Sequence, residues 1–65
     1  MGTIERTAAL LALIQGRRRV RISTLVEETG MSQTAVYRYL DALMAKWPIR
    51  RESGVVIYAG EKTSN

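Results

Sequence analysis

The residues of this chain best suited to recognising another molecule are the polar and aromatic side chains that follow Gly30. Apolar spacing predicts a helix between residues 33 and 46, and its exposed face carries Gln33, Thr34, Tyr37 and Arg38. In the major groove of DNA, a glutamine amide bonds adenine bidentately and a guanidinium bonds guanine. Threonine and tyrosine side chains contact phosphates or the thymine methyl group. We therefore predict that this face reads bases in double-stranded DNA.

Basic residues are concentrated on both sides of this helix. The net charge is +4, and residues 17–21 contain four arginines, a distribution typical of nucleic-acid binders. Free N–H groups at the start of the next helix favour anions, and a basic hairpin after residue 48 suits a DNA backbone or a narrow minor groove. Backbone or minor-groove contacts are predicted for Arg17, Arg18, Arg19, Arg21, Ser23, Thr24, Ser32, Arg50, Arg51 and Ser53.

Each of these signals also has a simpler structural interpretation. A polar helix face or a run of charge is often only solvated, and charged residues protect the edge strands of a sheet. The combination favours DNA binding, because an arginine run precedes the polar helix and a basic hairpin follows it. Asp41 is acidic on the same helix face, and we expect it to orient Arg38 or Tyr37, or to repel incorrect contacts, rather than to bind DNA itself.

The composition argues against catalysis. Without cysteine or histidine, the chain has no thiolate nucleophile, no imidazole base, no disulfide and only carboxylates for a metal ion. Glu27 and Glu28 are adjacent on a predicted helix, where successive side chains diverge by about 100° and cannot form a facing pair. We predict no enzymatic activity, no metal site and no cofactor.

The first element that must support the reading helix is another helix. Caps predict that it runs from Thr3 to Gln15, with Thr3 as its N-cap and Gly16 as its end. Its predicted core face consists of Ile4, Ala8, Leu11 and Ile14. Leu10 and Leu13 fall outside this stripe, which makes them candidate dimer contacts, with core packing as the alternative.

Residues 17–22 alternate charged and β-branched side chains and predict a short strand with Val20 and Ile22 turned inward. A second helix is predicted from Ser23 or Thr24 to Thr29, followed by a stop at Gly30. Thr24 and Glu27 have the spacing of a capping box.

Ser32 is the predicted N-cap of the reading helix, and Pro48 prevents its continuation. Residues 49–58 then predict a β-hairpin around a turn at 52–54, with glycine supplying a positive φ. Tyr39 is expected to be half-buried against the core.

This order of elements predicts one domain, mainly α with a small β-hairpin. It is the order of a winged helix-turn-helix, with three helices and a two- or three-stranded antiparallel wing, here over residues 1–60 with a flexible tail at 61–65. The spacing of the central apolar and glycine residues fits such a turn: Leu25, Gly30, Met31, Val36 and Leu40.

Four stretches resemble one group of proteins, namely residues 4–14, 16–20, 25–32 and 35–43. They are similar to the N-terminal winged helix-turn-helix of DeoR-like and WYL-domain transcriptional regulators, most specifically over residues 32–38. The resemblance implies a bacterial or phage regulator and assigns base reading to the four helix residues named first. Such regulators usually carry a sensing domain after the wing, so no small-molecule effector site is expected within this chain, whether it is a stand-alone protein or an excised domain.

We therefore predict a sequence-specific transcriptional regulator, a repressor, that binds double-stranded DNA as a homodimer on repeated half-sites. An apolar run long enough for a membrane span is missing, and a cytoplasmic, nucleoid-associated protein is expected. Two alternatives stay open: a winged-helix adaptor that binds an acidic protein, and an architectural or recombination-directionality factor that bends DNA.

Overall fold

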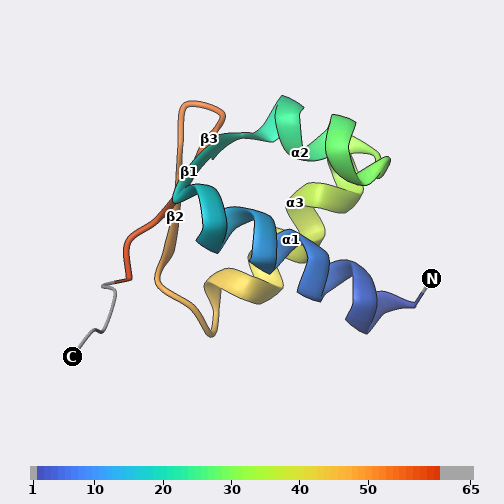
Figure 1. The fold of residues 1–65 in the computed structure, drawn as a ribbon, viewed down its shortest axis with the longest axis horizontal. Helices are drawn as coiled ribbons and strands as arrows, with labels where there is room; N and C mark the ends of the chain where they lie inside the picture. Colours follow the sequence, from blue (N-terminus) through green and yellow to red (C-terminus); the bar gives the residue numbers. More distant parts are fainter. Residues whose placement is uncertain (1, 61–65) are drawn as a thin grey trace.

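The computed structural model describes residues 2–60, which form three helices and one three-stranded antiparallel sheet (Figure 1). In chain order the elements are α1 (Thr3–Arg17), β1 (Arg19–Arg21), α2 (Ile22–Thr29), α3 (Gln33–Met44), β2 (Ile49–Glu52) and β3 (Val55–Tyr58). The predicted winged helix-turn-helix is confirmed, and its wing has three strands rather than two. The predicted tail at 61–65 lies outside the described residues.

The sheet has β3 at its centre, between β1 and β2. Val56 of β3 is paired with Val20 of β1 on one side and with Arg51 of β2 on the other. The β2–β3 turn consists of two residues, Ser53 and Gly54, with φ values of 51° and 77°, as a tight hairpin turn with two left-handed residues requires. The positive φ expected of glycine is confirmed, and Ser53 shares it.

The core lies where the three helices meet the inner face of the sheet. Its apolar residues come from every element: Leu10, Ile14, Val20, Ile22, Leu25, Val36, Leu40, Leu43, Ile49 and Val56. The helix-turn-helix residues expected to be buried are among them, and Val26, Met31 and Tyr39 are partly buried against the cluster. The half-buried position expected of Tyr39 is confirmed.

The predicted core face of α1 is wrong in part. Leu10 and Ile14 are fully buried, whereas Ile4 is 83% exposed and Ala8 is also exposed. The reason lies in what covers the helix: α1 contacts both other helices and two strands, which bury Leu10 and Ile14, whereas Ile4 and Ala8 line an open groove between α1 and the end of α3. Leu10 therefore has no surface to offer a second subunit in this structure, and core packing is its role. Leu13 is partly buried.

Both ends of α1 also differ from the prediction. The N-cap is Gly2, whose N–H donates to the Glu5 Oε1 at 2.7 Å, and Thr3 is the first helical residue. Gly16 does not end the helix, which runs to Arg17. Arg18 takes the left-handed C-cap position with φ 67° and donates its N–H to the Ile14 carbonyl at 2.8 Å.

The predicted start of α2 was one to two residues late. The strand β1 ends at Arg21, and Ile22 is both buried and the first residue of α2. The Ile22 N–H donates to the Gly54 carbonyl at 2.9 Å, so the first residue of α2 is tied to the wing turn, and α2 has no side-chain cap. Ser23 and Thr24 both lie in the first turn, and the capping box with Glu27 does not form.

The C-terminal end of α3 comes at Met44, two residues before the predicted end, with Ala45 as C-cap. The N–H groups of Lys46 and Trp47 both donate to the Leu43 carbonyl, and this tight turn leads into Pro48. None of the helices in residues 2–60 combines the length and the apolar character that a membrane span requires.

Candidate nucleic-acid interface

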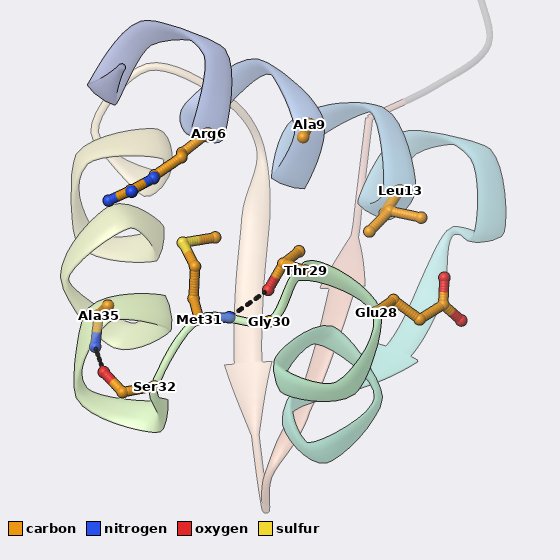
Figure 2. A pocket seen from close by; sticks show the side chains of 9 residues that line it. All are labelled: Arg6, Ala9, Leu13, Glu28, Thr29, Gly30, Met31, Ser32 and Ala35. Carbon is orange, nitrogen blue, oxygen red and sulfur yellow. Dashed lines mark hydrogen bonds between the residues drawn. The ribbon is translucent and has the colours of Figure 1, made fainter. Parts of the chain in front are cut away.

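The turn between α2 and α3 is held by local hydrogen bonds. Gly30 is the C-cap of α2 with φ 75°, and its N–H donates to the Val26 carbonyl at 2.9 Å. The Thr29 hydroxyl accepts from the Met31 N–H at 3.2 Å, and the Ser32 hydroxyl accepts from the Ala35 N–H at 3.1 Å (Figure 2). The predicted stop at Gly30 and the predicted cap at Ser32 are confirmed. Together they fix the direction in which α3 leaves the turn.

Behind this turn lies a hollow of about 750 Å³, between α1 and the start of α3 (Figure 2). The Met31 side chain points from the turn toward α1 within it. Ala9 and Leu13 form the α1 wall, and Arg6 and Glu28 stand toward opposite ends. Of the residues predicted to contact DNA, this hollow holds only Ser32.

The four predicted base-reading residues lie on α3 as expected. Gln33, Thr34 and Arg38 are exposed, and Tyr37 is half-buried. At about 100° per residue, they span an arc of about 140° around the helix, with Gln33 and Arg38 at its edges. Gln33 and Tyr37 therefore face the wing, whereas Arg38 faces the side of α1, where it shares a shallow groove with Tyr39.

A second hollow, of about 470 Å³, lies between the start of α2, the face of α3 and the wing turn. We call it the wing groove. It brings together five predicted contact residues from β1, α2, α3 and the wing turn, together with four apolar or glycine residues and one glutamate: Arg21, Ser23, Gln33, Tyr37, Ser53, Ile22, Val26, Gly54, Val55 and Glu27. The hydrogen bond from the Ile22 N–H to the Gly54 carbonyl joins two of these lining residues. Donors from helix, strand and turn thus converge on one concave surface.

The arginine run of residues 17–21 is divided by the fold. Arg17 forms a two-point ion pair with Glu28, with nitrogen–oxygen distances of 2.7 and 2.8 Å. The Arg18 guanidinium lies over the Tyr58 ring at 5.3 Å and donates to the Gly60 carbonyl at 2.6 Å. Arg19 and Arg21 flank buried Val20 on β1 and are exposed on the outer face of the sheet. Only Arg21 of the four lines the wing groove.

The wing arginines also separate. Arg50 lies in register with Ile57 and points away from the helices, 3.7 Å from the Glu52 carboxylate. Arg51 points the other way, toward α3. Its Nη1 is 3.1 Å from Asp41 Oδ1, and its guanidinium carbon lies 4.9 Å from the centre of the Tyr37 ring. Both arginines lie on β2, and the turn that follows consists of Ser53 and Gly54 alone, one residue shorter than the predicted turn at 52–54.

Asp41 has a different partner from the one expected. It was predicted to orient Arg38 or Tyr37, but its carboxylate bonds Arg51 across the gap to the wing. The strand alternation of β2 could have indicated this, since Ile49 is buried and residue 51 must share its face. The sequence analysis gave Glu27 no place in the DNA-binding surface, whereas the structure places it in the wing groove.

One titratable group on α3 has a shifted pKa. The Arg6 side chain, followed by that of Thr3, lies near the phenol of Tyr39 and holds its pKa below the ordinary value of 10.0. These contacts tie the first turns of α1 to the middle of α3. Within residues 2–60, no three acidic side chains are grouped closely enough to hold a metal ion.

Comparison with known families identifies the helical part of the chain. A family model described as the IclR helix-turn-helix domain matches residues 3–46, which are 44 of the 65 residues and contain α1, β1, α2 and α3. No curated protein and no solved structure matches the chain. The resemblance to DeoR-like and WYL-domain regulators is not confirmed, whereas the helix-turn-helix itself is. The chain therefore belongs to the IclR helix-turn-helix family, whose domain is a DNA-binding module of transcription regulators.

Proposed function

We propose that this domain, over residues 1–60, is a sequence-specific repressor that reads the major groove with α3 and holds the DNA backbone or minor groove with the wing. The wing groove is the single observation that carries the proposal, because it places hydrogen-bond donors from α2, α3 and the wing turn on one concave surface. Gln33 and Tyr37 project from α3 into it, beside Arg21 and Ser53. A helix flanked by such donors fits a major groove and its adjacent phosphates.

Base reading is assigned to the exposed arc of α3. Gln33 at the N-terminal end is placed for a bidentate contact with adenine, and Arg38 for guanine. Thr34 lies between them on the arc, and Tyr37 contributes its ring and hydroxyl from the wing side. If Arg38 reads a base, Arg38→Ala lowers affinity by about 1–3 kcal/mol and relaxes preference at one position of the site. Equal weakening on every sequence would make Arg38 a phosphate contact.

Backbone contacts are assigned first to the polar groups that the fold leaves accessible. Arg19, Arg21 and Arg50 are exposed on the sheet, and Ser23, Thr24, Ser32 and Ser53 lie at helix starts or in the wing turn. Arg17 and Arg18 would have to leave Glu28 and Tyr58 before binding a phosphate. Their contribution to DNA affinity is therefore smaller than that of Arg19 and Arg21.

A single small domain makes few base contacts, so useful specificity requires two half-sites and a homodimer. Because Leu10 is fully buried, Leu13 is the remaining one of the two predicted dimer contacts. Two large apolar side chains are exposed in residues 2–60, Ile4 and Trp47, and both line a groove between α1 and the end of α3. A cytoplasmic, nucleoid-associated location follows from the proposed role.

The proposal is tested by selecting bound sequences from a random duplex pool at two salt concentrations, with the complex sized by light scattering. Enrichment of a paired motif with half-sites about 10 base pairs apart is expected. Salt-sensitive binding without a motif would support an architectural DNA-binding factor instead. If no duplex binds, the adaptor that recognises an acidic protein replaces the regulator.

A further inference from the structure

Arg51 differs from every other arginine of the wing and of the run at 17–21 because it contacts the reading helix. Strand alternation places Ile49 and Arg51 on the inner face of β2. The Arg51 side chain is 32% exposed, whereas that of Arg50 is 62% exposed. Its guanidinium meets two α3 side chains, the Tyr37 ring at 4.9 Å and the Asp41 carboxylate at 3.1 Å.

The geometry of α3 makes this double contact possible. Tyr37 and Asp41 are four residues apart and therefore lie one above the other on the same helix face. A planar guanidinium can lie on an aromatic ring and donate to a carboxylate at once, whereas an ammonium group is a point charge without a plane to stack. Arg51 thus connects the wing to the residue that also lines the wing groove.

The contact has two consequences for DNA binding. It restricts the Tyr37 ring before DNA arrives, and a side chain that is already ordered loses less conformational entropy on binding. It also neutralises Arg51 locally, since the Asp41 carboxylate lies within ion-pair distance. A phosphate would have to compete with that carboxylate for the same guanidinium.

We propose that Arg51 is a positioning residue that fixes Tyr37 and the spacing between the wing and α3 for base reading, without itself contacting DNA. Asp41 has the same positioning role, because its carboxylate holds the Arg51 guanidinium over the Tyr37 ring. This inference rests on the proposed function and replaces the phosphate contact predicted for Arg51 from the sequence. It predicts that Arg51 affects discrimination between sequences, and that its charge does not enter the salt dependence of binding.

The test compares Arg51→Lys with Arg50→Lys, which makes the same change on the outward-facing neighbour. Affinities for the selected duplex and for a scrambled duplex are measured over a range of salt concentrations. Arg51→Lys is expected to reduce the affinity ratio about tenfold, the discrimination of one base contact, with an unchanged salt slope. Arg50→Lys is expected to leave the ratio unchanged.

A charge-removing variant separates positioning from phosphate binding. Arg51→Gln should lower the ratio without changing the salt slope, whereas loss of a phosphate contact would reduce the slope by about 0.9. Asp41→Asn keeps Arg51 but releases it from the helix, and it should lower the ratio as Arg51→Lys does. Thermal melts of all four variants exclude unfolding as the cause.

The outcomes distinguish this inference from the function on which it rests. If the wild-type protein does not discriminate between the two duplexes, the proposed function and the inference both fail. If the wild type discriminates and Arg51→Lys discriminates equally well, only the inference is overturned. A salt slope that falls by about 0.9 in Arg51→Gln would likewise assign Arg51 to a phosphate.

Discussion

The salt dependence of DNA binding can be calculated from which arginines the fold leaves without a strong internal partner. In residues 2–60, Arg17 and Arg51 have carboxylate partners at 2.7 and 3.1 Å, and Arg18 bonds a carbonyl. Arg19, Arg21 and Arg38 have no carboxylate within ion-pair distance in the described part of the chain, and the Arg50–Glu52 pair is long and exposed, a kind of pair that contributes little. Arg6 lies apart, against Tyr39.

Arg38 is assigned to a base, so three arginines remain for phosphates: Arg19, Arg21 and Arg50. They give a log–log slope of about −2.7 per protomer, since each neutralised phosphate contributes about 0.9. Affinity should then fall about 40-fold between 50 and 200 mM salt. Arg21→Gln should reduce the slope to about −1.8. Arg17→Gln removes the same charge from an arginine that is already paired with Glu28, and it should leave the slope nearly unchanged.

Fluorescence anisotropy with a labelled duplex at four or more salt concentrations measures these slopes, and thermal melts show that both variants remain folded. The comparison of the two salt slopes is decisive, because both variants carry the same formal charge. Equal slopes for Arg17→Gln and Arg21→Gln would refute the reasoning that internal pairing decides which arginines reach phosphates. A slope near zero for the wild type would remove the backbone contacts altogether.

Three further predictions concern the fold and its titration. Leu10→Ala should lower the free energy of unfolding by about 2–5 kcal/mol, measured by urea denaturation, whereas Ile4→Ala on the exposed start of α1 should change it by less than about 0.5 kcal/mol; equal effects would contradict the burial of Leu10. Gly30→Ala should cost about 1–2 kcal/mol in the same assay, because φ is 75° there, and an unchanged stability would mean that the turn can relax. The pKa of Tyr39 lies below its ordinary value in the folded protein, so the unfolded state binds more protons between the two pKa values, and stability rises with pH across that window. NMR titration of the ring should show this shift and its loss in Arg6→Gln, and an identical titration of both proteins would exclude Arg6 as the cause.

The helix-turn-helix could be predicted from the sequence because its signals are local. Ser32 caps α3 with its own side chain, and Gly30 supplies the left-handed residue that ends α2. Val36 and Leu40 are four residues apart on α3 and both are fully buried, as is Leu25 on α2. Each of these signals depends on neighbours within four residues, so no knowledge of the tertiary fold is needed to interpret them.

The errors in α1 and α2 have a tertiary cause. Gly16 is a reasonable helix end by propensity, but Arg18 takes the left-handed position, where the Tyr58 ring and the Gly60 carbonyl hold its side chain. The start of α2 similarly depends on the carbonyl of Gly54, which lies 32 positions along the chain from Ile22. Local caps cannot indicate partners at such distances.

The sequence was sufficient to predict the exposed residues of α3, but it predicted the positions of the arginines only in part. A run of charged residues in a sequence does not show where each side chain points. In the structure, Arg17 contacts Glu28, Arg18 contacts Tyr58, and the alternation of β1 leaves Arg19 exposed on the sheet. Alternation on β2 separates Arg50 from Arg51 in the same way. Asp41 was expected to contact residues of its own helix, whereas its hydrogen-bond partner is Arg51 of the wing.

The most direct test of the central claim is an NMR titration of the ¹⁵N-labelled protein with the selected duplex. If the wing groove is the DNA-binding surface, the largest changes in amide chemical shift should fall on four residues that line it: Ser23, Gln33, Tyr37 and Ser53. Residues of the hollow behind the turn, such as Ala9 and Leu13, should shift little. Shifts concentrated on that hollow, with the wing groove unaffected, would contradict the account.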